Sequence, residues 1–143
     1  MKKIKIYPKK ERYIFVANGF YANGHWALKQ EFCEEIWEKE LKPFPREVDV
    51  LAAFGGFFDP EYVELKPSRF LVEQYNTNNF ARRYDHTGEV PKSIYIDETF
   101  HQMFKKAAFN FKFFGSSKDK PILITTDKNE FVGVVMGMRV DEE

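Results

Sequence analysis

Hydrophobic and polar positions follow the two-residue period of β-strands over much of this chain. The clearest example lies near the carboxyl end, where apolar runs 122–126 and 131–138 are separated by Asp127-Lys128-Asn129, residues that tolerate a tight chain reversal. We therefore predict a β-hairpin. Because the second run is apolar at nearly every position, we expect it to be covered on both faces, as a central strand of a sheet is.

Shorter strands are predicted before this hairpin. Residues 4–6 and 13–17 read as an opening hairpin, and two Asn-Gly turns, at Asn18 and Asn23, precede a short strand over 25–29. The run 48–54 fits either a strand or a buried helical turn, and further strands are predicted at 62–65, 69–75, 93–96 and 110–114.

Two stretches change to the helical period of 3.6 residues. In 30–41, apolar side chains share one side, glutamates occupy the other, and two prolines follow. The second helix is expected over 98–108, with Asp97 as its N-cap. These elements predict one domain over 1–143, of the α+β class, with a largely antiparallel sheet and two helices packed on it.

The residues between the predicted elements are mostly short turns, with one exception. Residues 76–92 are polar and rich in turn-forming residues, so they are predicted to be the longest loop, and loops carry function more often than cores do. The chain has 143 residues and a formal net charge of zero, which excludes a broad electrostatic attraction to nucleic acid or an anionic membrane. Local charged patches remain compatible with this balance.

The amino-terminal sequence, the lengths of the apolar runs and the single cysteine indicate the cellular location. The amino terminus carries charges without the apolar stretch of a signal peptide, and no apolar run approaches the roughly 18–20 residues that span a bilayer. The single cysteine, Cys33, excludes an internal disulfide and a cysteine-based metal cluster, as fits a reducing compartment. We expect a soluble cytoplasmic protein with no membrane partner.

Signatures of catalysis are weak. Gly55-Gly56 lacks the lysine and hydroxyl of a phosphate-binding loop, and Cys33 lies among glutamates on an apolar helical face, where its thiol pKa would be raised. Glu98 and His101 would share one helical face, an arrangement that suits a metal pair, but their spacing matches no zinc signature. No catalytic residue, metal ligand or cofactor is assigned, and an enzyme is the less favoured class.

The order of motifs in the carboxyl-terminal part points to a known family. Ser93-Ile-Tyr-Ile-Asp leads into a helix, Lys120-Pro-Ile-Leu-Ile begins a strand, and Val135-Met-Gly-Met-Arg-Val140 approaches the end. This succession resembles the carboxyl-terminal part of the bacterial DNA polymerase sliding clamp, the β subunit, which has a Lys-Pro-Val/Ile strand and a final Met-Pro-Met-Arg. Gly137 stands where that family has proline.

A segment near the amino end is also similar to this family. The segment Val16-Ala-Asn-Gly-Phe-Tyr-Ala-Asn-Gly-His-Trp-Ala-Leu28 is similar to the family's Ala-Thr-Asp-Gly-His-Arg-Leu-Ala, with Gly24, His25 and Leu28 as the matching positions and Trp26 in place of arginine. In the clamp, the two segments form the pocket that captures short peptides. The resemblance therefore implies a clamp-like fold and a groove for an apolar peptide of a protein partner, formed by Gly24, His25, Leu28, Met136, Met138 and Arg139.

The methionine pair has a simpler interpretation. Met136 and Met138 are spaced by two, as core residues on one face of a strand are. Clamp helices also contact DNA phosphates, so the resemblance implies DNA as a further partner. The candidate DNA-binding residues are Arg82, Arg83, Lys105, Lys106 and Lys112, although a lysine pair on a helix is also typical of a solvated face.

These expectations give two hypotheses for function. The first is a small non-enzymatic module, associated with DNA replication or with protein interaction, that captures an apolar peptide. A clamp has three domains and this chain has room for one, so a ring would be a homo-oligomer. The alternative is a small enzyme or ligand-binding domain that uses loop 76–92 with His86 or His101.

Overall fold

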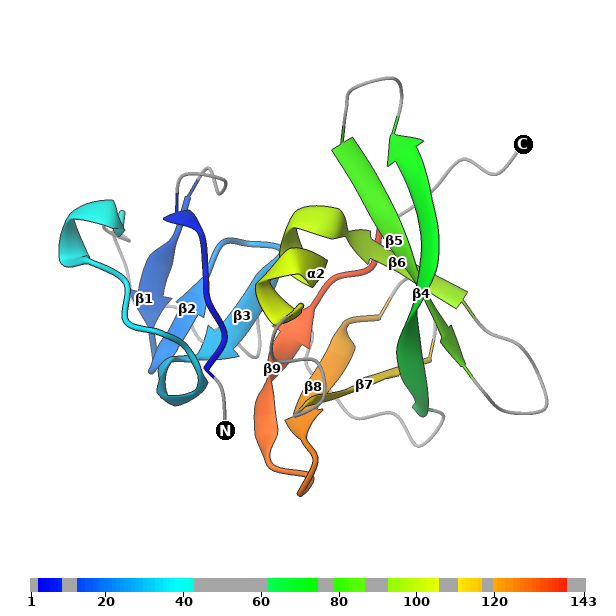
Figure 1. Ribbon diagram of the computed structural model, residues 1–143. Coiled ribbons are helices and arrows are strands. Elements are labelled where there is room, and N and C mark those ends of the chain that lie inside the picture. Colours follow the sequence, from blue (N-terminus) through cyan, green and yellow to red (C-terminus); the bar gives the residue numbers. More distant parts are fainter. Residues whose placement is uncertain are drawn as a thin grey trace.

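Nine β-strands and one α-helix form the part of the chain that the computed structural model describes, which is residues 3–8, 13–42, 62–74, 79–86, 93–105, 111–116 and 120–138. Two short 3-10 turns complete it (Figure 1). The strands are β1 (Phe15–Ala17), β2 (Phe20–Ala22), β3 (Trp26–Lys29), β4 (Val63–Gln74), β5 (Asn79–His86), β6 (Ser93–Asp97), β7 (Phe111–Gly115), β8 (Ile122–Thr126) and β9 (Phe131–Val135). The helix is α2 (Glu98–Phe104), and the turns are η2 (Gln30–Phe32) and η3 (Glu38–Glu40).

All the strands belong to one sheet, in the order β1-β2-β3-β9-β8-β7-β4-β5-β6, and all neighbours are antiparallel. An isolated bridge joins Tyr95 in β6 to Met138, which follows β9, and the Met138 N–H donates to the Tyr95 carbonyl at 2.7 Å. The sheet is therefore rolled, because its outermost strand β6 meets the residues that follow β9, the strand in fourth place in this order. Helix α2 connects β6 to β7 and packs on this part of the molecule (Figure 1).

The core has two parts, on opposite faces of the β3–β9 pair. Trp26 and Leu28 belong to the larger cluster, while Ala27 and Val134 belong to the smaller one. Strand β9 lies between β3 and β8, as its apolar sequence predicts, and Gly133 allows the close approach of β3. A Cβ at Gly133 would collide with the Ala27 carbonyl oxygen and lie 3.0 Å from the Leu28 Cα. The predicted carboxyl-terminal hairpin is confirmed as β8–β9.

The predicted helix over 30–41 is wrong. This stretch contains η2 and η3 with extended backbone at Cys33, because residues 32–34 pair with the amino-terminal segment and the bonds within the stretch form only short turns. The Ile4 N–H donates to the Phe32 carbonyl, and the Glu34 N–H donates to the Ile4 carbonyl, both at 2.8 Å. The predicted hairpin of 4–6 with 13–17 is wrong for the same reason.

Strand β1 pairs instead with β2 across the predicted Asn18-Gly19 turn, where both residues have positive φ angles of 52° and 81°. Such angles are those of a tight hairpin turn, which Asn and Gly favour. The short strand predicted at 25–29 is confirmed as β3. The fold is thus α+β, mostly β, with one α-helix in the described part of the chain rather than the two expected.

The predictions for the polar middle of the chain are wrong for two strands, β4 and β5. Residues 62–65 and 69–75 were expected as separate strands, but β4 runs through Pro67, with an irregular register between Pro67 and Leu71 that accommodates the missing N–H. The predicted loop over 76–92 contains strand β5, which pairs with both β4 and β6.

Several other expectations are confirmed or lie outside the described residues. Strands β6 and β7 and the start of α2 lie where they were predicted. The Asp97 side chain accepts a hydrogen bond from the Thr99 N–H at 2.8 Å, as an N-cap does. The run at 48–54 and the predicted end of the second helix, 106–108, lie outside the described part.

Candidate functional site: a methionine-lined pocket

A pocket of about 260 Å³ lies where β3 begins, β9 ends and α2 starts. The segments that form it come from three parts of the chain, 23–26, 97–100 and 135–138, and they include three of the residues proposed for peptide binding. The lining residues are Asn23, His25, Trp26, Asp97, Phe100, Val135, Met136, Gly137 and Met138. The structure therefore brings His25, Met136 and Met138 together around one cavity.

The turn before β3 positions His25. Gly24 has a φ angle of +90°, which a residue with a Cβ rarely adopts, and the Asn23 carboxamide oxygen accepts hydrogen bonds from the N–H groups of His25 (2.9 Å) and Trp26 (3.1 Å). The His25 carbonyl accepts a hydrogen bond from the Met136 N–H at 2.8 Å. Gly24 thus contributes to the pocket through backbone conformation, since it forms the turn without lining the cavity.

The methionine segment, residues 136–138, follows β9 and lies along the pocket between the start of β3 and β6. Met136 is bonded to the residue before β3, and Met138 is bonded to Tyr95 of β6, so both backbone positions are fixed. Both side chains are half-buried, which leaves part of each exposed. They differ in this from the fully buried core residues that their spacing also suggested.

The opposite wall is aromatic and contains one unusual polar atom. Trp26 is only 2 % exposed, and its ring centroid lies 6.0 Å from that of Phe100. Within the described residues, the buried Trp26 Nε1–H has no hydrogen-bond partner. The Asp97 carboxylate lies at the same cavity while it caps α2. The wall therefore combines a rigid apolar surface with one carboxylate.

The two other predicted peptide-binding residues are placed differently. Leu28 is completely buried in the larger core cluster and does not line the pocket. Arg139 lies outside the described residues. Sequence reasoning did not propose Trp26 or Phe100 as site residues, although Trp26 was noted as a departure from the clamp motif.

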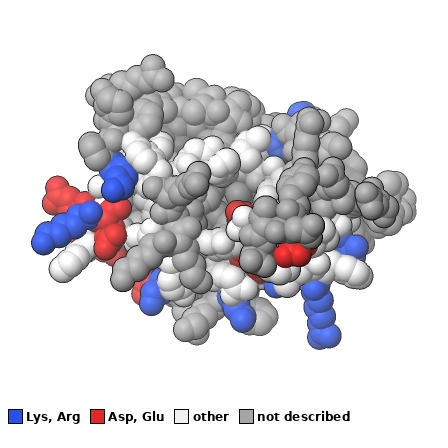
Figure 2. All heavy atoms as spheres, turned by 90° about the horizontal axis from the view of Figure 1, so that it is seen from above, with Lys and Arg blue, Asp and Glu red and all other residues white. Residues whose placement is uncertain are grey.

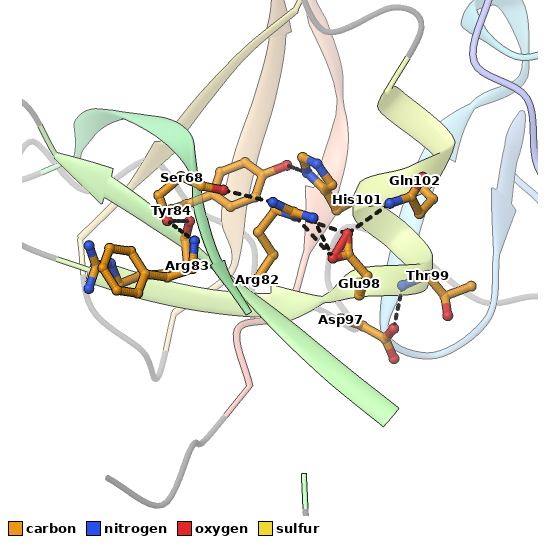
Figure 3. A network of polar contacts seen from close by, with 10 residues as sticks. Ser68, Arg82, Arg83, Tyr84, Asp97, Glu98, Thr99, His101 and Gln102 are labelled. Atoms are coloured by element: carbon orange, nitrogen blue, oxygen red, sulfur yellow. Dashed lines mark hydrogen bonds and ion pairs between the residues drawn. The ribbon is translucent and has the colours of Figure 1, made fainter. Parts of the chain in front are cut away.

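The arginines proposed for DNA binding already have carboxylate partners, and Figure 3 shows the partner of Arg82. The Arg82 Nε donates to both Glu98 oxygens, at 2.9 and 3.0 Å, and its Nη1 donates to the Ser68 carbonyl at 2.8 Å. Arg83 is paired with Asp85, with Nε 2.7 Å from Oδ1, and this hydrogen-bonded pair raises the pKa of Arg83. The positive charge of each arginine is thus offset locally.

The basic candidates do not form one continuous surface in the described part of the chain. Arg82 and Arg83 are successive residues of a strand, so their side chains leave on opposite faces. Lys105 is exposed after α2, Lys112 is half-buried in β7, and Lys106 lies outside the described residues. On the face shown in Figure 2, basic and acidic side chains are interspersed.

The histidines of the alternative hypothesis also have partners. The His101 Nδ1 lies 2.7 Å from the Tyr84 hydroxyl (Figure 3), and the His86 Nδ1 lies 3.0 Å from the Glu64 carbonyl oxygen. Burial, helped by the nearby positive charge of Arg82, lowers the pKa of His101 to about 4. The imidazole is therefore neutral at physiological pH. The same burial raises the pKa of Tyr84, whose hydroxyl stays protonated.

Metal binding and thiol chemistry find no support among the described residues. In the described ranges, no group of three or more His, Cys, Asp or Glu side chains is arranged to hold a metal ion. The Glu98 carboxylate is bonded to Arg82 and to Gln102 rather than to His101. Burial raises the pKa of the Cys33 thiol to about 12, as expected from its apolar surroundings.

Comparison of the chain with protein-family models, with curated proteins and with solved structures finds no match. Among the described residues, α2 is too short and too polar to cross a membrane, and no other helix there qualifies. The resemblance to the sliding clamp therefore remains a prediction that rests on the sequence motifs.

Proposed function

We propose that this protein is an interaction module that captures an apolar side chain of a peptide in the methionine-lined pocket. The observation that carries the proposal is the convergence of His25, Met136 and Met138 on one cavity from opposite ends of the chain. These residues were singled out on sequence motifs alone. Their convergence supports a shared binding role.

The chemistry of the walls suits an apolar anchor. Methionine side chains are flexible and polarizable, so they adapt to anchors of different shape. Trp26 and Phe100 provide a rigid surface opposite them, and aromatic contacts contribute strongly to protein interfaces. At about 260 Å³, the pocket is smaller than the ~300–1,000 Å³ typical of small-molecule sites. That size favours one or two side chains of a peptide over a whole cofactor.

The resemblance to the sliding clamp supplies the biological setting of the proposal. On this proposal the protein is a DNA-replication-associated module of clamp type, with a homo-oligomeric ring and DNA as further features. These features rest on the sequence motifs. Arg82 and Arg83 are paired with carboxylates, so their positions add no support for DNA binding. Peptide capture is therefore the main part of the proposal.

The test is fluorescence polarization with a labelled short peptide that carries adjacent Leu and Phe, compared with the same peptide carrying two serines. We expect the Leu-Phe peptide to bind, and Met138→Ala to weaken it by about tenfold through loss of apolar contact. The substitution leaves the backbone hydrogen bond to Tyr95 in place. The matched control is Leu71→Ala, which shortens an apolar side chain that is 45 % exposed on β4.

Two results would contradict the proposal. One is equal binding of the Leu-Phe and serine peptides, because the pocket would then not select apolar anchors. The other is equal loss of affinity in Met138→Ala and Leu71→Ala, because the contact would then not be specific to the pocket. Circular dichroism of each variant checks that the fold is retained.

A further inference from the structure

A second concave surface lies away from the methionine-lined pocket, between the amino-terminal segment and the stretch that contains η3. This groove has a volume of about 650 Å³, and residues from 5–8 form one wall while residues from 34–40 form the other. Its lining residues are Lys5, Ile6, Tyr7, Pro8, Glu34, Glu35, Ile36, Trp37 and Glu40. None of them lines the pocket, so the two surfaces are separate.

The groove is a built feature of the fold with an apolar floor. Ile6 and Ile36 are buried in the larger core cluster, so the floor is continuous with the core. The bridge between Ile4 and Cys33 joins the two walls, and the Tyr21 hydroxyl accepts a hydrogen bond from the Ile36 N–H at 3.2 Å. The wall that contains Ile36 is thus joined to β2 through one hydrogen bond, and the two walls are joined to each other by the bridge.

Trp37 stands on the rim and is 74 % exposed, the largest exposure among the described large hydrophobic residues. Tryptophan in such a position is costly to leave in water and is a frequent anchor of protein interfaces. The Lys39 ammonium lies 5.7 Å from the centre of the Trp37 ring. One face of the ring therefore already contacts a positive charge of the chain itself.

The charged side chains that line the groove are mainly acidic. The charged lining residues are three glutamates, Glu34, Glu35 and Glu40, and one lysine, Lys5, so the lining carries a net charge of −2 in a protein whose net charge is zero. Within the described residues, Glu34, Glu35 and Glu40 take part in no ion pair, since the pairs there join other residues. Their charges are available to a ligand.

We infer that this groove binds a basic segment of a partner protein. An apolar side chain of that segment packs on the floor formed by Ile6 and Ile36, and lysine or arginine side chains lie against the glutamate rim and the Trp37 ring. Charge complementarity favours a cationic peptide, because the lining holds three carboxylates and one ammonium group. This binding site is additional to the methionine-lined pocket and does not depend on it.

The test uses two labelled synthetic peptides of equal length, one alternating Lys with Leu and one alternating Glu with Leu. We expect the basic peptide to bind and the acidic one not to bind. Trp37→Ala and the triple variant Glu34→Gln, Glu35→Gln, Glu40→Gln should each weaken the basic peptide by about tenfold. Because the attraction is electrostatic, raising the salt concentration should lower the affinity of the native protein for the basic peptide more than the affinity of the triple variant.

Matched controls come from the same structure. Glu38→Gln removes a charge from the same segment at a residue that does not line the groove, and Phe70→Ala shortens an aromatic residue that is 58 % exposed on β4. Both should leave the affinity within about twofold of the native protein. Met138→Ala should do the same, because that residue lines the other cavity.

Four outcomes would overturn the inference. They are failure of the basic peptide to bind, equal binding of the acidic peptide, unchanged affinity in the Trp37 or triple variant, and a loss in Met138→Ala as large as that in Trp37→Ala. Light scattering completes the test: a native dimer that Trp37→Ala converts to monomer would assign the groove to a second copy of this chain. Failure of the Leu-Phe peptide in the pocket would leave the groove inference unaffected.

Discussion

The methionine-lined pocket and the groove beside Trp37 are both concave, but the walls of the pocket belong to paired strands, whereas the walls of the groove are irregular segments outside the sheet. The pocket is formed where paired strands end, and hydrogen bonds from Met136 and Met138 fix its methionine wall to two other parts of the sheet. The groove is formed by segments outside the sheet, joined by the Ile4–Cys33 bridge and one tyrosine hydroxyl.

This difference teaches that the two surfaces should respond differently to change. A wall made of paired strands opens only with the sheet, whereas a wall of irregular backbone with few hydrogen bonds opens locally at lower cost. We therefore expect pocket substitutions to affect global stability and groove substitutions to affect mainly local protection and binding.

The largest effect is expected from Gly133→Ala, which tests the framework of the pocket. The added Cβ would collide with the Ala27 carbonyl in the neighbouring strand, and backbone cannot yield as a side-chain end can. We expect a loss of about 3 kcal/mol in the free energy of unfolding, measured by urea denaturation.

Gly115→Ala is the matched control for this substitution. Its Cβ would meet the ends of the Ile94 and Leu65 side chains, at 2.7 and 2.8 Å, and these can move. It should therefore cost clearly less than Gly133→Ala. An equal loss in the two variants would contradict the importance of the β3–β9 contact.

Acid should destabilise the pocket side through His101, which follows the pocket residue Phe100 in α2. The pKa of His101 is lowered from 6.5 to about 4, so between these values the unfolded chain takes up a proton that the folded chain does not. Stability is therefore retained above pH 6.5 and falls as the pH decreases toward 4, by at most about 1.4 kcal/mol per pH unit.

The measurement is urea denaturation at several pH values for the native protein and for His101→Gln. The groups that face His101 are Tyr84, Arg82, Glu98 and Lys105, and they are present in both proteins. The difference between the two curves isolates the histidine. Parallel curves would show that His101 is not protected from protonation in the folded state.

A smaller effect is expected from Tyr21→Phe, which acts on the groove. The change removes the hydroxyl that accepts the Ile36 N–H and leaves that buried donor unpaired, at a cost of about 1 kcal/mol. Amide hydrogen exchange should accelerate at Ile36 while the β8–β9 hairpin keeps its protection. Uniform acceleration across both regions would instead show that the groove wall opens only with the whole sheet.

The smallest effect on stability is expected from Trp37→Ala. Because this side chain is mostly exposed, its removal should change the free energy of unfolding by less than about 0.5 kcal/mol, although it should weaken peptide binding at the groove. Trp26→Phe is the contrasting substitution, since that ring is buried beside the pocket. A large loss of stability in Trp37→Ala would show that the ring supports the fold rather than a ligand.

The sequence predicts elements well where local signals agree with the fold. The Asn18-Gly19 turn, the Asp97 cap and the β8–β9 hairpin depend on turn and cap chemistry that acts within a few residues, and all three are confirmed. The prediction of a helix over 30–41 was wrong because the apolar positions of this stretch suit a helical face as well as they suit the observed pairing of Cys33 with Ile4. That pairing is a long-range contact, which periodicity does not encode.

The polar middle of the chain shows a second limit. Strand β5 was taken for a loop because its residues are mostly polar, but Tyr84 is fully buried and Arg82 is satisfied by Glu98 from α2. Polar side chains are compatible with a strand when partners come from elsewhere in the fold. Likewise, sequence motifs indicated His25 and the methionines, whereas Phe100 joins the pocket only through the placement of α2.

The bridge between Tyr95 and Met138 has a consequence for the behaviour of the protein at high concentration. A long strand with unpaired N–H and C=O groups at the margin of a sheet is a template for strands of other molecules and promotes aggregation. Of the two outermost strands, β6 is engaged by Met138 and β1 has only three residues. The bridge to Met138 thus covers the middle of the outer edge of β6 and leaves less of it open to a strand of another molecule.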